Sequence, residues 1–62
     1  MRKLKNYTPQ NHYIVVNPYG EAYIGMIGGI FQYSPDWDKA KPLEHSSTRY
    51  LMRVKGNELL EL

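Results

Sequence analysis

The tetrapeptide Asn17-Pro18-Tyr19-Gly20 constrains the fold of this chain most strongly, because it separates two runs of β-forming residues. Proline presets the backbone φ at the second position of a type I turn, and glycine at the fourth position relieves the exit from the turn. The run from His12 to Val16 is β-branched and aromatic, and a similar run returns from Glu21 to Ile27. The sequence therefore predicts an antiparallel hairpin with its turn at residues 17–20.

A second turn is predicted at Gly28-Gly29, because both central positions of a type I′ turn need a positive φ. Residues 30–33 would then form a third strand. Ser34 and Pro35 are typical of a helix start, and Pro42 limits the helix that follows to one or two turns. We expect Trp37 to anchor this short helix in the core.

The segment from His45 to Leu62 allows two interpretations. As a helix, it would be capped at Ser46 or Ser47 and end at Gly56. As a strand, it would alternate through residues 50–54 and turn tightly at residues 55–58. In either case the leucine-rich residues 58–62 are expected to pair as the last strand.

A chain of 62 residues forms one domain with one thin hydrophobic core. The absence of cysteine excludes disulfides and cysteine-based zinc sites, and it fits a reducing compartment. No apolar run follows the basic N-terminus, and the apolar stretch at 22–31 is interrupted by glycines and too short for a membrane span. We therefore expect a cytoplasmic protein without membrane contact.

The positive charge is concentrated near the N-terminus, at Arg2, Lys3 and Lys5. Residues 1–11 show no hydrophobic period, and we interpret them as a flexible basic arm before a single globular domain at 12–62. The remainder of the chain holds five basic residues (8 − 3) and six acidic ones, so the body of the protein is nearly neutral. The high proportion of basic residues is thus a property of the arm.

A resemblance bears on the ambiguous C-terminal half. The Tyr-rich hairpin with Gly20-Glu21-Ala22-Tyr23-Ile24-Gly25, followed by Asp36-Trp37-Asp38-Lys39-Ala40-Lys41-Pro42-Leu43, resembles short accessory proteins of bacteriophages over residues 12–62. The resemblance implies a small module that acts by binding, with a helix before the last strand and a location in the host cytoplasm. The expected fold is therefore α+β, an antiparallel sheet of three or four strands with one short and one longer helix. The alternative is a five-stranded, barrel-like β domain.

No residue pattern predicts catalysis. The hydroxyl side chains stand in no nucleophile motif, and the carboxylates of Asp36 and Asp38 are better explained as favourable charges at a helix start. Gly25-Met26-Ile27-Gly28 has the spacing of a nucleic-acid-binding Gly-x-x-Gly loop, but its middle residues are apolar. We expect no catalytic, cofactor or metal site, and hence no enzyme.

Tyrosine is the one excess in the composition, with six residues. Tyr13 and Tyr23 lie on paired strands and could share a face with Phe31 or Tyr33. Tyrosine and arginine are favoured anchors of protein interfaces, whereas exposed tyrosines beside cations also stack unpaired bases. The expected function is a binding protein that docks on another protein. The alternative is a single-stranded nucleic-acid module using the arm and a tyrosine face, and a homo-oligomer stays open. The expected partner-binding residues are Tyr13, Tyr19, Tyr23, Tyr33, Arg49 and Arg53.

Overall fold

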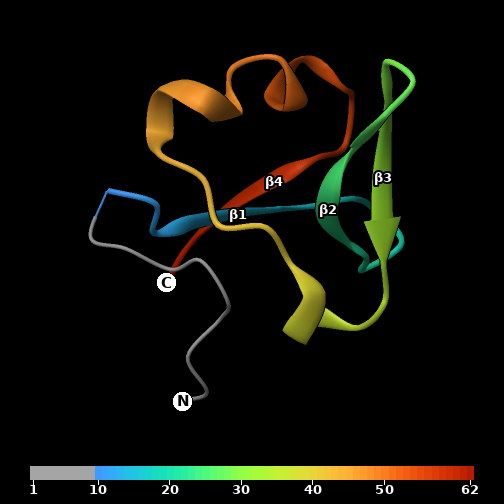
Figure 1. The fold of residues 1–62 in the computed structure, drawn as a ribbon, viewed down its shortest axis with the longest axis horizontal. Coiled ribbons are helices and arrows are strands. Elements are labelled where there is room, and N and C mark those ends of the chain that lie inside the picture. The colour runs from blue at the N-terminus through green and yellow to red at the C-terminus, as the bar shows by residue number, and fades with distance from the viewer. Residues whose placement is uncertain (1–9) are drawn as a thin grey trace.

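A computed structural model describes residues 10–62 as a four-stranded antiparallel sheet with three short 3₁₀ turns (Figure 1). In space the strands follow the order β3-β2-β1-β4. The last strand therefore returns beside the first, and β3 and β4 form the two edges. The elements are β1 (Tyr13–Val16), β2 (Ala22–Ile27), β3 (Ile30–Ser34), η1 (Trp37–Lys39), η2 (His45–Thr48), η3 (Leu51–Arg53) and β4 (Glu58–Glu61).

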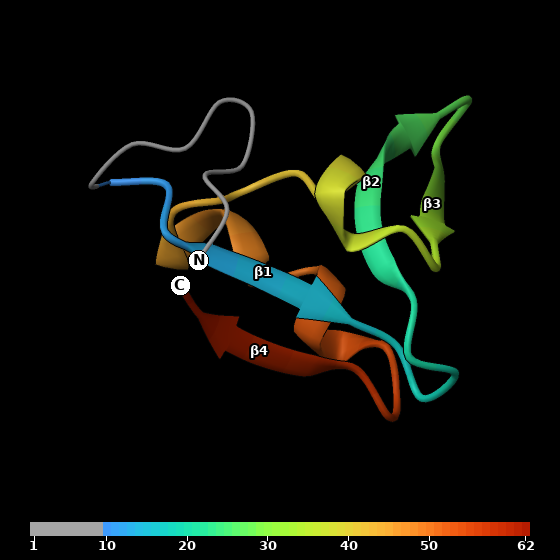
Figure 2. The same ribbon diagram turned by 90° about the horizontal axis from the view of Figure 1, so that it is seen from below.

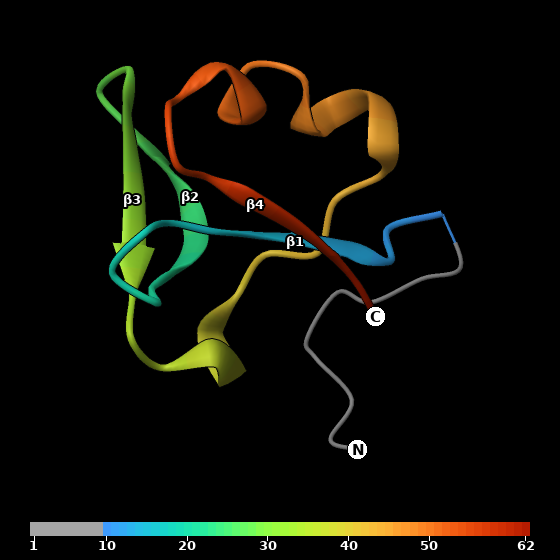
Figure 3. The same cartoon turned by 180° about the vertical axis from the view of Figure 1, so that it is seen from behind.

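Strand β1 forms the centre of the core, since both of its faces are buried. On one face, Ile14 and Val16 pack with Ala22 and Ala40. On the other face, Val15, which is fully buried, packs with a second cluster that includes Leu51. Burial on both faces explains why this strand is a continuous apolar run without polar alternation. The turn segment with η2 and η3 covers the Val15 face, and η1 lies on the opposite side of the sheet (Figures 1 and 3).

The sheet bends sharply between β1 and β2. These strands share a single registered pair, Val16 with Ala22, whereas β1 pairs with β4 over its whole length. Figure 2 shows β2 and β3 standing across the direction of β1 and β4. A register shift between Tyr23 and Gly25 marks a β-bulge at residue 24, and such bulges increase the local twist.

Both predicted hairpin turns are confirmed. The amide of Gly20 donates to the carbonyl oxygen of Asn17 at 3.0 Å, and the Asn17 side chain accepts from the amides of Tyr19 and Glu21. At the second turn, Gly28 and Gly29 have φ values of 57° and 80°, as a two-residue type I′ connection requires. The predicted strands around these turns and the last strand are also present.

The predicted α+β fold with a longer helix is wrong, because residues 45–55 form two 3₁₀ turns in place of a helix or a strand. The backbone bonds here span three residues, as from the Val54 amide to the Leu51 carbonyl oxygen. That oxygen also accepts from the side chain of Asn57, and the Thr48 hydroxyl donates to the His45 carbonyl oxygen. Side chains thus bond two carbonyls that an α-helix would use, and a Ser-Ser-Thr run has low helix propensity.

The barrel-like alternative is also wrong, because the described sheet has four strands. A fifth pairing is reduced to an isolated bridge between Tyr13 and Leu43. Pro42, immediately before this bridge, has no amide hydrogen to extend a ladder. Residues 1–9, most of the predicted arm, lie outside the described residues. Across residues 10–62, we find no helix with the length and apolar character needed to span a bilayer.

Trp37 is not the buried anchor that its sequence context predicts. Its side chain is 43% exposed, and its indole nitrogen donates a hydrogen bond of 2.8 Å to the carbonyl oxygen of Gly20. The helix it was expected to fix is the single turn η1, which Asp36 caps by accepting a hydrogen bond from the Asp38 amide. Trp37 therefore stabilises the β1–β2 turn by a hydrogen bond at the surface. The buried contact between this part of the chain and the core comes from Ala40.

Candidate partner-binding surface

The predicted tyrosine face is largely an internal cluster. The rings of Phe31 and Tyr33 meet the ring of Tyr23 edge-on, at centroid distances of 5.8 and 6.0 Å. Tyr23 is only 6% exposed, and burial, together with the neighbouring Tyr33, raises the pKa of its hydroxyl. Little of the Tyr23 ring is therefore left to contact a partner.

The other predicted tyrosines are separated in space. The Tyr33 hydroxyl accepts a hydrogen bond from the side-chain amide of Asn57 at 2.9 Å. Tyr13 stacks at an angle on His12 and meets the ring of His45 at 5.4 Å. Tyr19 stands at the tip of the β1–β2 turn and is 86% exposed. The structure thus brings Tyr23 and Tyr33 together and leaves the other two apart.

The two predicted arginines, by contrast, lie in one segment with η2 and η3. Buried Thr48 and Leu51 fix this segment to the core. The residues between and beside them face outward, so that Arg49 and Arg53 are exposed. The spacing of the two buried residues therefore determines which side chains the segment offers to solvent.

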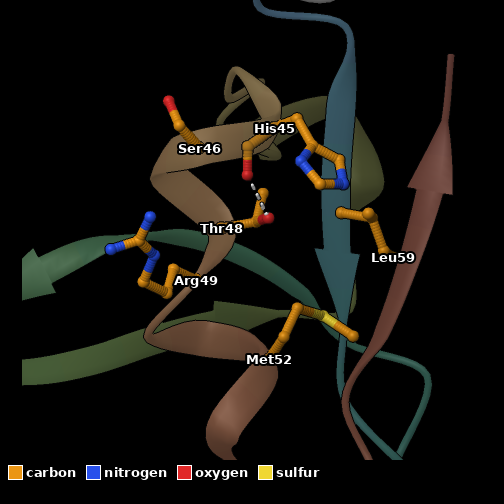
Figure 4. Close-up of a pocket in the computed structure, with 6 residues that line it drawn as sticks. All are labelled: His45, Ser46, Thr48, Arg49, Met52 and Leu59. Atoms are coloured by element: carbon orange, nitrogen blue, oxygen red, sulfur yellow. Dashed lines mark hydrogen bonds between the residues drawn. The ribbon is translucent and has the colours of Figure 1, made fainter.

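A cavity of about 460 Å³ opens beside this segment. Figure 4 shows that Met52 of η3 and Leu59 of β4 extend toward the same space, with the His45 ring above them, whereas the Arg49 guanidinium points away from Leu59. The cavity thus has an apolar side next to β4 and a cationic margin at Arg49, directly after η2. Its lining residues are His45, Ser46, Thr48, Arg49, Met52 and Leu59.

In the same segment, the guanidinium carbon of Arg53 lies 5.0 Å from the centre of the Tyr50 ring. Tyr50 is 63% exposed, so this cation–π pair stands at the surface. We call the cavity lining together with Tyr50 and Arg53 the η2–η3 surface. It combines an apolar hollow, an exposed aromatic ring and two cations.

The described residues hold no cluster of metal-ligating side chains. No three histidine or carboxylate side chains within residues 10–62 come together as a metal site would require. The Thr48 hydroxyl donates to the His45 carbonyl oxygen of its own turn at 2.6 Å, and the His12 ring, which stacks on Tyr13, lies 3.5 Å from the Glu61 carboxylate. The η2–η3 surface thus offers apolar contact area and positive charge.

Comparisons with protein-family models, with curated proteins and with solved structures give no match for this chain. The resemblance to phage accessory proteins therefore stays a prediction.

Sequence reasoning assigned no partner-binding role to four residues of this surface. They are His45, Tyr50, Met52 and Leu59. The spacing of Tyr50 and Arg53, three positions apart, was the one available signal, because residues three apart meet in a helical turn.

Proposed function

We propose that this chain is a non-enzymatic binding protein that docks on another protein through the η2–η3 surface. The observation that carries the proposal is the cavity between Met52 and Leu59, with Arg49 at its margin. An apolar side chain of a partner would fill the hollow, and an acidic side chain would pair with the arginine. A cytoplasmic location, which the cysteine-free sequence favours, is part of this proposal.

The chemistry of the surface supports a protein partner. Tyr50 and Arg53 belong to the residue types that dominate binding energy at interfaces, where truncation of such an anchor costs about 2 kcal/mol or more. Met52 is flexible and polarizable, so it can adapt to the shape of an inserted side chain. An apolar cavity next to cations therefore fits a segment that alternates apolar and acidic residues.

The nucleic-acid alternative has weaker support. It needs a row of exposed rings, since each stacked base gains about 1–3 kcal/mol from an aromatic platform. Tyr23 is buried, and the Tyr33 hydroxyl is bonded to Asn57. On the η2–η3 surface one exposed tyrosine, Tyr50, remains for stacking.

The test is affinity recovery with the full chain as bait, from extracts of its source cells, with and without nuclease. Met52→Glu puts a carboxylate on the apolar side of the cavity, and Lys39→Glu makes a charge change on η1, across the sheet. We expect nuclease-resistant protein bands that Met52→Glu abolishes and Lys39→Glu preserves. Bands lost on nuclease treatment would support nucleic acid, and bands that survive Met52→Glu would place docking elsewhere.

A further inference from the structure

The outer edge of β3 carries backbone groups that point toward solvent. The Lys41 amide donates to the carbonyl oxygen of Tyr23 at 2.9 Å, on the side away from β3. The registered pair of Tyr23 and Tyr33 is therefore not hydrogen-bonded, and the backbone groups of Tyr33 point away from β2. Backbone groups two residues apart in a strand point to the same side, so the amide and carbonyl of Phe31 also point away from β2. No strand within residues 10–62 pairs with this edge.

The two edges of the sheet differ in charge. Edge strand β4 begins with Glu58 and ends with Glu61, and charges on an edge strand discourage pairing with another chain. Residues 22–35, which span β2 and β3, contain no charged residue. The β3 edge therefore lacks the protection that the β4 edge has.

The β3 edge is complementary to a second copy of itself. If two copies of β3 run antiparallel around a two-fold axis at Gln32, Phe31 of each copy lies opposite Tyr33 of the other. These are the two residues whose backbone groups point outward, so both pairs exchange backbone hydrogen bonds. The pairing is isologous, and no like charges face each other across it.

The same geometry covers exposed apolar side chains. Ile30 lies on the face of β3 opposite the packed Phe31 ring, next to its registered partner Ile27, and these two isoleucines are 67% and 72% exposed. Trp37 follows the other end of β3, on the side of the sheet where η1 lies. Antiparallel pairing brings Ile27 and Ile30 of each copy toward Trp37 of the other copy.

We propose that this protein forms a two-fold dimer in which the β3 strands of two copies pair antiparallel around Gln32. The two sheets then join into one continuous antiparallel sheet. This interface is distinct from the η2–η3 surface, so the dimer would present two copies of that surface and would bind a multivalent partner with avidity. The dimer does not depend on the proposed function.

A cysteine scan tests the register, because the natural chain has no cysteine. Directly opposite residues in a non-hydrogen-bonded antiparallel pair have Cα atoms about 4.5 Å apart, within disulfide range. Under mild oxidation, Gln32→Cys should give a covalent dimer rapidly. Ile30 and Ser34 lie on the same face of β3 as Gln32. In the dimer, however, the two copies of residue 30, and likewise those of residue 34, are too far apart to cross-link, so Ile30→Cys and Ser34→Cys serve as controls. Equal cross-linking of all three variants, or none at position 32, would overturn the register.

Sedimentation equilibrium over a concentration series tests the dimer itself. Gln32→Lys places two ammonium groups together at the axis and should weaken the dimer by at least tenfold. Glu58→Lys changes a charge on the opposite edge and should leave the dimer intact. Circular dichroism confirms that both variants fold. Wild-type protein that stays monomeric throughout the series, larger aggregates without a dimer, or a dimer that Gln32→Lys leaves intact would each refute the proposal.

Discussion

The side-chain amide of Asn57 donates a hydrogen bond of 2.9 Å to the hydroxyl of Tyr33, which lies 24 positions earlier in the chain. The same nitrogen donates to the carbonyl oxygen of Leu51 at 2.9 Å, and the Asn57 side chain is buried. One amide therefore ties edge strand β3 to the segment that carries the η2–η3 surface. It does so at the entrance to β4, where the chain returns to the sheet.

Replacing Asn57 with alanine should lower the free energy of unfolding by about 1–3 kcal/mol, because the Tyr33 hydroxyl and the Leu51 carbonyl oxygen each lose a hydrogen bond in a buried setting. The measurement is urea denaturation of Asn57→Ala, Tyr33→Phe and the double variant. If the hydrogen bond couples the two residues, the double variant should lose less stability than the sum of the single ones. Strict additivity would show that the Asn57–Tyr33 bond contributes nothing.

Gly56→Ala should destabilise the protein far more than Gly28→Ala. Both glycines have positive φ values, 91° and 57°, where an L-residue loses about 1–2 kcal/mol. A Cβ at Gly28 would meet open space, whereas a Cβ at Gly56 would collide with the ring of Pro18. Thermal midpoints of the two variants provide the comparison. Equal midpoints would contradict the contact between the β1–β2 turn and the turn before β4.

Stability should decline at alkaline pH, and Tyr23 should contribute to the decline. Burial raises the pKa of Tyr23 above its ordinary value of 10.0. The unfolded chain therefore loses this proton first, and the stabilisation is lost as the pH rises from that value through the raised pKa. Thermal melts of wild type and Tyr23→Phe at about pH 9 and about pH 11 isolate the effect, because linkage to this group vanishes in the variant. An identical pH dependence in both proteins would contradict the burial of the hydroxyl.

Val15→Ala should be more destabilising than Trp37→Ala, although tryptophan is the larger side chain. Val15 is fully buried between its neighbours, and the loss should approach about 1.5–3 kcal/mol. Trp37 is 43% exposed, so its truncation should cost about 1–2 kcal/mol, including its hydrogen bond to Gly20. Chemical denaturation ranks the two. The reverse order would show that Trp37 belongs to the core.

Local chemistry explains which parts of the fold were predictable. The turns at 17–20 and 28–29 depend on proline and glycine backbone preferences, which act within a few residues. The segment at 45–55 depends on the Asn57 amide, which is supplied from beyond the segment, so periodicity within it was not decisive. Trp37 likewise takes its position from a bond to Gly20, 17 positions earlier.

The candidate surface was predictable only in part for the same reason. Arg49 and Arg53 were marked from their charge, and the structure places them in one turn segment. Leu59 borders the cavity only because β4 pairs beside β1, which is a long-range consequence of topology. Tyr23 was marked as a partner-binding residue from its type, but packing against Phe31 and Tyr33 holds it inside.

The most direct test of the central claim is a fluorescence-anisotropy titration of the full chain over a salt series. The probes are a labelled peptide from a recovered partner and labelled single-stranded oligonucleotides. We predict that the peptide binds with a modest salt dependence, is lost on Met52→Glu and is kept with Lys39→Glu. Oligonucleotide binding at micromolar or tighter affinity, falling steeply with salt and lost on Tyr50→Ala without unfolding, would contradict docking on a protein.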